Sequence, residues 1–454
     1  MSDGVGASKI GKGANGRSAI AGPVIIMFVL FVAIACQADD TFIIRPASGN
    51  ISDIANRHNL TVIRALDSRN QVFLVDNTSG ETADQMEMEL DADSTVATCE
   101  FNTAVAVTEG ATLNQSTGAI LDGLPPLAAV SFFGSTVPNY YLVQPATSIM
   151  HLSTVQSKMH ITGAGIVAII DTGVDPNHPT LASSLLPGYD FVHDWSGTAS
   201  EFVDLPSATS AVLNQSTGAI LDSTHIAIVN QSTAAILDQS TGAILDSTQL
   251  PAAFGHGTMV AGIVHLVAPT AQIMPLKAFS ANGTGQLADI LRAIYYAADH
   301  NAAVINMSFS LPDASPELVS AINYAVKKGV VPVASVGNTG QMTVSYPAAI
   351  SNVIGVGSTS NLDVRSTFSS YGSMVNVGAP GEGILTTYPG GHYAAAWGTS
   401  FSAPFVAGTA ALVEDVESGL KVSDVSSAIG HHAKSVSQMG KGRIDIYEAV
   451  DEFF

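Results

Sequence analysis

Several segments of the chain carry residue types that together could perform nucleophilic acyl transfer. The segment that organises the others is GTSFSAPFVAG at 398–408, in which Ser400 stands at the expected start of a buried helix of small and apolar residues. Free backbone N–H groups and the positive end of the helix dipole favour an anion at that place. Ser400 is therefore the candidate nucleophile, and it needs a general base, an orienting carboxylate and donors for an oxyanion.

Two further segments supply a carboxylate and a base. Asp171 ends the apolar run IVAII at 166–170, which predicts a buried parallel strand with Asp171 at its carboxyl end, where sites of open α/β sheets collect. His256 lies between two glycines at the head of an Ala/Val-rich helix, and glycines allow other backbone to approach the imidazole closely. Taken alone, Asp171 could be a strand-ending turn and His256 a structural histidine.

Asn338 completes the constellation, because it follows the apolar segment VVPVASVG at 330–337. By itself it is either a turn former or an amide that donates to an oxyanion. In the combined site, His256 would take the proton of Ser400 and return it to the leaving group, while Asp171 would fix the imidazole tautomer. The Asn338 amide and the Ser400 N–H would hold the oxyanion. This chemistry requires no cofactor.

The composition indicates a large globular core and excludes some classes of function. Hydrophobic residues make up 46% of the chain and charged residues 12%, which argues against disorder. A net charge of −21 repels phosphate backbones, so nucleic-acid binding is not expected. The two cysteines, Cys36 and Cys99, imply no disulfide framework, and the histidines form no His-Glu-x-x-His pattern of a zinc peptidase.

Residues 1–36 predict an export signal. A basic lead is followed by an apolar run at 19–35 that ends in the small-x-small sequence AIA. The alternatives are a lipid anchor at Cys36 and a membrane anchor that is retained. All three place the remainder outside the cytoplasm, either secreted or attached to a membrane through the N-terminal segment.

The rest of the chain divides into three parts. In residues 40–108, short apolar runs alternate with segments whose apolar residues have helical spacing. This pattern predicts a small α+β domain. Residues 109–138 form a linker with one copy of a repeat that recurs, with a period of eight, in an insertion at about 205–250. An even period stays in phase with a strand and predicts β structure if the block is ordered. The block is either a low-complexity expansion in a surface loop or a ribbon that contacts substrate or a partner.

These motifs resemble those of the subtilisin-like serine peptidases, or subtilases. The matching segments are IIDTGVDPNHP around Asp171, GHGTMVAGIV around His256, INMSFS at 305–310, ASVGN ending at Asn338, and the segment around Ser400. The resemblance implies that 139–454 is a catalytic domain with a doubly wound, mostly parallel α/β sheet flanked by helices. It also implies that the 40–108 domain is an inhibitory propeptide.

By the same resemblance, Ser308, Phe309 and Ser310 would pair with an extended polypeptide substrate as an added strand. Structural calcium is frequent in the family, although no residue here matches a ligand motif well enough to name. The octad insertion widens the spacing between Asp171 and His256. Met259 stands where the family often has a second histidine, and Ser310 and Leu311 stand where glycines often line the substrate groove.

The expected protein is thus an exported serine endopeptidase made as an autoinhibited precursor, with extended polypeptides as substrates and its own propeptide as intramolecular inhibitor. One alternative is an inactive exported binding or adhesion protein on the same fold. Another is a different acyl transfer at the same site, by an esterase or a peptide ligase.

Overall fold

A computed structural model describes residues 40–69, 71–107, 128–197, 199–205, 227–228, 234–236 and 250–454. These residues fall within one compact unit, Ala38–Phe454. The predicted export segment, most of the linker at 109–138 and most of the octad insertion lie outside the described residues. Within the described part of the chain, no helix combines the length and apolar character needed to cross a membrane.

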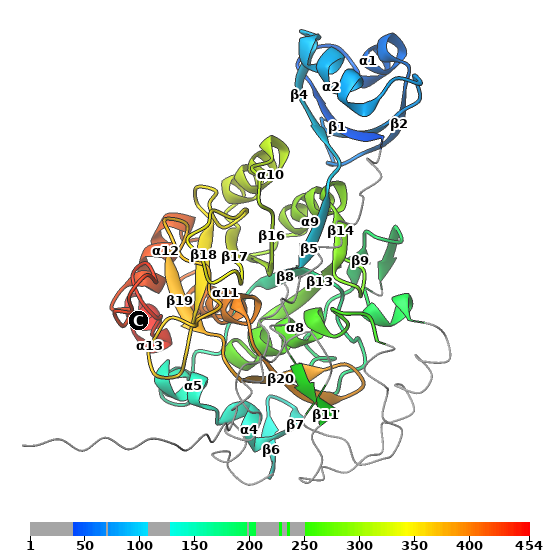
Figure 1. Ribbon diagram of the computed structural model, residues 1–454. Coiled ribbons are helices and arrows are strands. Elements are labelled where there is room, and N and C mark those ends of the chain that lie inside the picture. The colour runs from blue at the N-terminus through cyan, green and yellow to red at the C-terminus, as the bar shows by residue number, and fades with distance from the viewer. Residues whose placement is uncertain are drawn as a thin grey trace, which may run out of the picture. The chain divides into compact units, whose positions relative to one another are not determined.

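An eight-stranded, mostly parallel sheet forms the centre of the main domain (Figure 1), in the order β10-β9-β13-β8-β15-β17-β18-β19. The strands are β8 (Ile166–Asp171), β9 (Gly188–Asp190), β10 (Trp195–Gly197), β13 (Gln272–Lys277), β15 (Val304–Met307), β17 (Val331–Ser335), β18 (Ile354–Thr359) and β19 (Val377–Pro380). All neighbouring pairs are parallel except β10 with β9. The predicted doubly wound α/β class is therefore confirmed.

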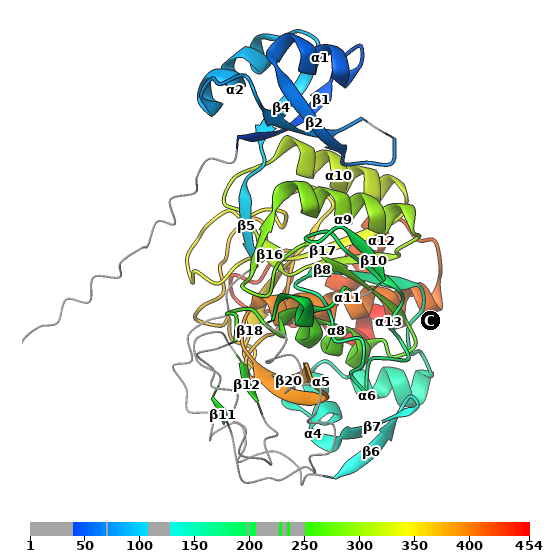
Figure 2. The ribbon, with the colours of Figure 1, turned by 90° about the vertical axis from the view of Figure 1, so that its right-hand side faces the viewer.

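Helices cover both faces of this sheet, which explains the continuous apolar runs of its strands. Along β8, Val167 and Ile169 pack in the core that contains α8 (His256–Val267) and α11 (Thr399–Val416). Their neighbours Ala168 and Ile170 pack on the opposite side with α9 (Leu287–Asp299) and α10 (Pro316–Lys327). Figure 2 shows these two helix pairs on either side of the strands. Side chains that alternate between two buried faces must all be apolar.

Shorter elements surround this core. The helices are α4 (Asn139–Leu142), α5 (Pro145–Ile149), α6 (Leu152–Thr154), the π-helix η1 (Val155–Met159), the 3-10 helix η2 (Glu201–Asp204), α12 (Val422–Gly430) and α13 (Ile446–Asp451). The hairpins are β6 (Ala129–Phe132) with β7 (Ser135–Pro138), and β20 (Ile384–Tyr388) with β21 (His392–Ala396). Two pieces of the octad insertion, β11 (Ala227–Ile228) and β12 (Ala234–Ile236), are strands, and β12 pairs with β21. The even repeat period predicts strands there.

The N-terminal unit, residues 40–102, is a four-stranded antiparallel sheet in the order β2-β3-β1-β4 with two helices. Its elements are β1 (Thr41–Pro46), α1 (Ile51–His58), β2 (Leu60–Ala65), β3 (Phe73–Asn77), α2 (Ala83–Ala92) and β4 (Val96–Phe101). Phe42 and Ile44 pack in the unit's own core, whereas Ile43 packs with α9 and α10 of the main domain. One face of this sheet therefore belongs to the main core.

Candidate active site

Asp171 and His256 meet where the last residue of β8 lies beside the first residue of α8. The imidazole Nδ1 of His256 is 2.7 Å from Oδ1 of Asp171, and both side chains are buried. Gly257 makes this approach possible, since a Cβ there would lie 2.0 Å from the carbonyl oxygen of Gly173 and 3.2 Å from Asp171 Oδ1. The glycine after His256 is thus required by packing, as the sequence predicts.

The tautomer of the neutral His256 ring follows from its hydrogen-bond partner. A carboxylate only accepts hydrogen bonds, so Nδ1 carries the proton and donates to Asp171. Nε2 is then the basic nitrogen of the neutral ring. It is buried and has no hydrogen-bond partner among the residues that the structure describes. Such a nitrogen can take a proton from a nucleophile that turns toward it.

Ser400 is the second residue of α11 and is fully buried. The ring of Phe401, the next residue, lies 5.4 Å from the His256 ring, centroid to centroid. The Ser400 hydroxyl donates to the carbonyl oxygen of Ser308 at 3.3 Å, and the Ser308 hydroxyl donates to the carbonyl oxygen of Ser400 at 2.9 Å. The fold therefore places the start of α11 near His256, with Ser308 as the immediate neighbour of Ser400.

Asn338 contacts the same helix start. Its Oδ1 accepts from the backbone N–H of Thr399 and from the Thr399 hydroxyl, both at 2.9 Å. Since a backbone N–H can only donate, the carbonyl oxygen must face Thr399, and the amide NH₂ lies at the other end of the group. The donor that could stabilise an oxyanion is thereby directed away from Thr399.

An extended segment lies between two strands of the main domain. Strand β5 (Ala104–Val107) pairs antiparallel with β14 (Thr284–Gln286) on one side and with β16 (Phe309–Ser310) on the other. Phe309 and Ser310, predicted to bind substrate, thus pair with Val107 and Ala106. The sequence did not indicate β14.

Ser308 differs from its two neighbours, since it lies outside β16. Its side chain is buried, and its hydroxyl accepts from the Asn306 amide at 2.9 Å while donating to Ser400. The Ser308 hydroxyl thus supports the Ser400 backbone, and main-chain pairing of Ser308 with an extended substrate stays a prediction.

Glu201 is the group that sequence reasoning missed. It is fully buried, and its carboxyl accepts from Thr172 Oγ1 at 3.0 Å, from Gly255 N at 3.1 Å and from Thr258 Oγ1. Burial raises the pKa of Glu201 to about 8, against the hydrogen bonds from the two threonines. No motif surrounds Glu201 in the sequence, so no local signal could have found it.

Three other residues that the sequence analysis singled out lie in environments that indicate a structural role. Met259 is buried in the core between the sheet and α8. Leu311 is buried, and its backbone pairs with Tyr346. Burial raises the pKa of the Cys99 thiol to about 12, which makes it unreactive at neutral pH.

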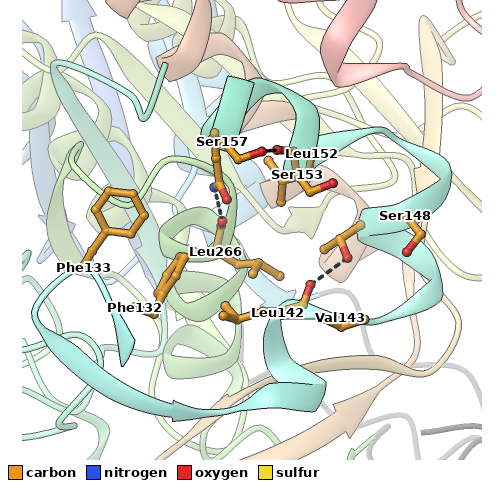
Figure 3. Close-up of a pocket in the computed structure, with 11 residues that line it drawn as sticks. Phe132, Phe133, Leu142, Val143, Ser148, Leu152, Ser153, Ser157 and Leu266 are labelled. Carbon is orange, nitrogen blue, oxygen red and sulfur yellow. Dashed lines mark hydrogen bonds between the residues drawn. The ribbon is translucent and has the colours of Figure 1, made fainter. Parts of the chain in front are cut away.

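A pocket of about 370 Å³ lies elsewhere in the main domain (Figure 3). Its lining is mostly apolar and comes from the β6–β7 hairpin, the short helices α4 to α6, η1 and α8; it includes Phe132, Phe133, Leu142, Val143, Leu152 and Leu266. None of the candidate catalytic residues lines it. Within the described residues, no group of three His, Cys, Asp or Glu side chains could hold a metal ion, and the calcium expectation stays a prediction.

Comparison with known proteins places this site in a family. Residues 163–445 match the family model Peptidase_S8, the subtilase family. The chain is 36% identical over 298 residues to thermitase of Thermoactinomyces vulgaris, covering 63% of this chain and 88% of thermitase. It is 37% identical over 289 residues to a thermophilic serine proteinase of a Bacillus species, strain AK1, covering 63% of this chain and 61% of that protein.

A solved structure of a cold adapted subtilisin-like serine proteinase aligns with a TM-score of 0.48 at 26% identity, over 63% of this chain and 88% of that one. The family model alone covers more than half of the chain, and its range contains the Asp171–His256 pair and the helix start at Ser400. The chain therefore belongs to the subtilase family of serine endopeptidases.

Proposed function

We propose that this chain is an exported, autoinhibited precursor in which Asp171, His256 and Ser400 hydrolyse peptide bonds through an acyl-enzyme. The observation that carries the assignment is the 2.7 Å contact between His256 Nδ1 and Asp171 Oδ1. It leaves Nε2 as the base, buried in a ring that lies beside Phe401 of α11, the helix that carries Ser400. An inactive binding protein on this fold would not need that arrangement.

The reaction follows from these positions. Rotation about χ1 moves the Ser400 hydroxyl from the Ser308 carbonyl to Nε2 of His256, because catalytic hydrogen bonds often form only with substrate bound. Nε2 takes the proton as Oγ attacks the peptide carbonyl, and the oxyanion is held by the Ser400 N–H and the Asn338 amide. His256 then protonates the departing amine. A water molecule, deprotonated by His256, then attacks the acyl-enzyme in the same way, which releases the acyl group as a carboxylic acid and returns the proton to Ser400.

The substrate is an extended polypeptide held through its main chain. Strand β5 supports this, because it sits between β14 and β16 with hydrogen bonds on both sides. Main-chain pairing provides affinity for many sequences, and alternate side chains provide specificity. In β5 the side chains of Val105 and Val107 are buried while those of Ala104 and Ala106 are exposed, so a substrate would bury every second side chain.

The same strand supports autoinhibition, because a groove that holds β5 cannot hold another substrate. The N-terminal unit that precedes β5 adds contacts: Arg45 pairs with the buried Glu317 at 2.5 Å, and Glu100 accepts from Ser315 Oγ at 2.9 Å. We place the processing cleavage on the C-terminal side of Val107. Export, free or with attachment at the N-terminal segment, rests on the sequence of residues 1–36.

The test compares the purified full chain with Ser400→Ala and Ser402→Ala. Ser402 is the matched control, since it lies in the same helix but its hydroxyl bonds Pro380 O. The wild type and Ser402→Ala should shorten with time, expose a new N-terminus after Val107 and cleave casein. Ser400→Ala should stay intact. A wild type that stays inert after a trace of active subtilase is added would favour the binding protein.

A further inference from the structure

Glu201 links the two backbone segments that carry Asp171 and His256. On one side, its Oε2 accepts from the hydroxyl of Thr172, the residue that follows Asp171. Thr172 in turn lies 3.3 Å from Asp171 Oδ1 through its hydroxyl and accepts from Gly257 N at 3.1 Å. The carboxyl of Glu201 is thus one hydroxyl away from the carboxylate of Asp171.

On the other side, Glu201 reaches the start of α8. Its Oε2 also accepts from the backbone N–H of Gly255, and its Oε1 accepts from the hydroxyl of Thr258. These two residues flank His256. One buried carboxyl therefore bonds groups on both sides of the base as well as the residue next to the orienting carboxylate.

The backbone around Glu201 is tightly packed. Gly173 has φ of +110°, and a Cβ there would lie 2.7 Å from Ala199 O and 2.8 Å from the nitrogen of Glu201. The backbone N–H of Val174 donates to Ala199 O at 2.8 Å. The segment that carries Glu201 is packed directly against the turn that follows Asp171, so its carboxyl has a fixed position.

The Thr172 hydroxyl has one hydrogen and two acceptors within reach. When Glu201 is ionised, its oxygens only accept, and the hydrogen goes to Oε2 at the shorter distance. When Glu201 is protonated, its O–H can donate to Thr172 Oγ1. The Thr172 hydrogen then turns to Asp171 Oδ1, which lowers the strength of that carboxylate as a partner for His256.

Several charged or titratable groups surround Glu201. Asp171 on β8, Lys277 on β13 and Tyr388 on β20 interact electrostatically with it, and His256 follows Gly255, whose N–H bonds the carboxyl. Burial is the largest cause of the raised pKa of Glu201, Asp171 adds to the rise and Lys277 opposes it. The Lys277 ammonium is itself compensated, since it donates to Asp204 at 2.6 Å.

We propose that Glu201 is a positioning residue for the Asp171–His256 pair, and that its ionisation accelerates the chemical step. The proposal rests on the triad assigned above. Ionised Glu201 withdraws the Thr172 hydrogen from Asp171 and adds negative potential near the imidazolium that forms in the transition state. Protonated Glu201 does the reverse. Because Glu201 bonds neither β14 nor β16, the effect should appear in kcat and leave KM unchanged.

The test measures kcat and KM for a fluorogenic peptide across pH, using wild type and Glu201→Gln produced as full chains and allowed to process. A glutamine has the shape of the protonated carboxyl, so the two enzymes should have similar kcat well below pH 8. As Glu201 ionises through about pH 8, the ratio of wild-type to variant kcat should rise about fivefold, the order expected for the net contribution of one typical hydrogen bond.

Asp445→Asn is the matched control. It makes the same acid-to-amide change at a buried carboxyl that bonds His151 Nδ1 at 2.7 Å and Tyr447 N, in α13, at 3.1 Å. Its kcat ratio to wild type should not vary with pH. A Glu201→Gln ratio that is equally constant, with wild type active, would overturn the inference while leaving the endopeptidase assignment intact.

If Glu201→Gln does not fold, as judged by circular dichroism, a second pair of variants tests whether the Thr172 hydroxyl couples Glu201 to Asp171. Thr172→Val removes the hydroxyl that connects Glu201 to Asp171, whereas Thr172→Ser keeps it. The serine variant should retain the rise in kcat near pH 8, whatever its absolute rate, and the valine variant should lose it. Retention of the rise in Thr172→Val would refute the role of this hydroxyl.

Discussion

Ionisation of Glu100 should weaken the hold of the N-terminal unit on the main domain. Glu100 lies on β4 and accepts hydrogen bonds from Ser315 Oγ at 2.9 Å and from Glu317 N at 3.1 Å, at the start of α10. Burial raises the pKa of Glu100 from 4.5 to about 7; the Glu317 carboxylate adds to the rise, and the two hydrogen bonds oppose it. A glutamate released from this contact into water titrates near 4.5.

The sign and size of the effect follow from linkage. The complex binds the Glu100 proton more tightly than the separated unit does. The stabilisation of the complex is therefore complete below pH 4.5 and is lost as pH rises to about 7. Each unit of pKa difference is worth a factor of ten, so the apparent dissociation constant should increase by at most roughly a few hundredfold over this interval, and then level off.

The assay uses the self-processed chain, in which the N-terminal unit remains bound until it is diluted. Hydrolysis of a fluorogenic peptide is followed over a dilution series at each pH and is normalised to its plateau at high dilution, which removes the pH dependence of catalysis itself. The concentration at half-maximal specific activity gives the dissociation constant. Glu81→Gln, a change at an exposed position of the same unit, serves as control.

Glu100→Gln should remove most of this pH dependence. The amide oxygen can still accept from Ser315 and from Glu317 N, but the group no longer titrates. The variant should therefore dissociate like wild type near pH 5 and more than tenfold less than wild type near pH 8. Equal slopes for wild type, Glu100→Gln and Glu81→Gln would show that Glu100 is not the group that couples binding to protons.

Three further results are expected. Asn338→Ala should reduce kcat about 10²- to 10³-fold with little change in KM, because one oxyanion donor is lost; peptide hydrolysis measures this, and Asn338→Asp, which keeps the oxygen but loses the donor, should behave alike. Gly257→Ala should lower the free energy of unfolding by about 2–3 kcal/mol in a Ser400→Ala chain, since its Cβ would lie 2.0 Å from Gly173 O; urea unfolding checks it, and an unchanged midpoint would contradict the packing argument. Unfolding of Ser400→Ala should become easier as pH rises from 4.5 to about 8, where the unfolded chain releases the Glu201 proton before the folded one does, and this slope should flatten in the double variant with Glu201→Gln.

The sequence predicts the elements of the site well because they are local. Asp171 ends an apolar run and His256 and Ser400 begin helices, so strand ends and helix starts locate all three without knowledge of tertiary contacts. Gly257 is marked in the same way by the need for close backbone approach. The doubly wound sheet follows from continuous apolar strands that alternate with amphipathic or small-residue helices.

The residues that the sequence analysis did not identify are those whose role depends on contacts between distant segments. Glu201 lies 57 residues from Thr258, in a stretch without any motif, and an acidic residue is most often exposed. Its burial depends on Gly173 and Thr172 lying alongside. Glu100 meets Ser315 across 215 residues, and no periodicity in either segment encodes that meeting.

Glu100 and Glu201 act in the same direction although they lie in different parts of the chain. Burial raises the pKa of each carboxyl, to about 7 for Glu100 and to about 8 for Glu201. Ionisation of Glu100 should release the N-terminal unit and β5 from the groove, and ionisation of Glu201 should accelerate the chemistry that the groove then performs. A rise in pH would thus increase both the fraction of open enzyme and its turnover. The double variant Glu100→Gln with Glu201→Gln separates the steps, because dissociation and kcat should each lose their own pH dependence independently.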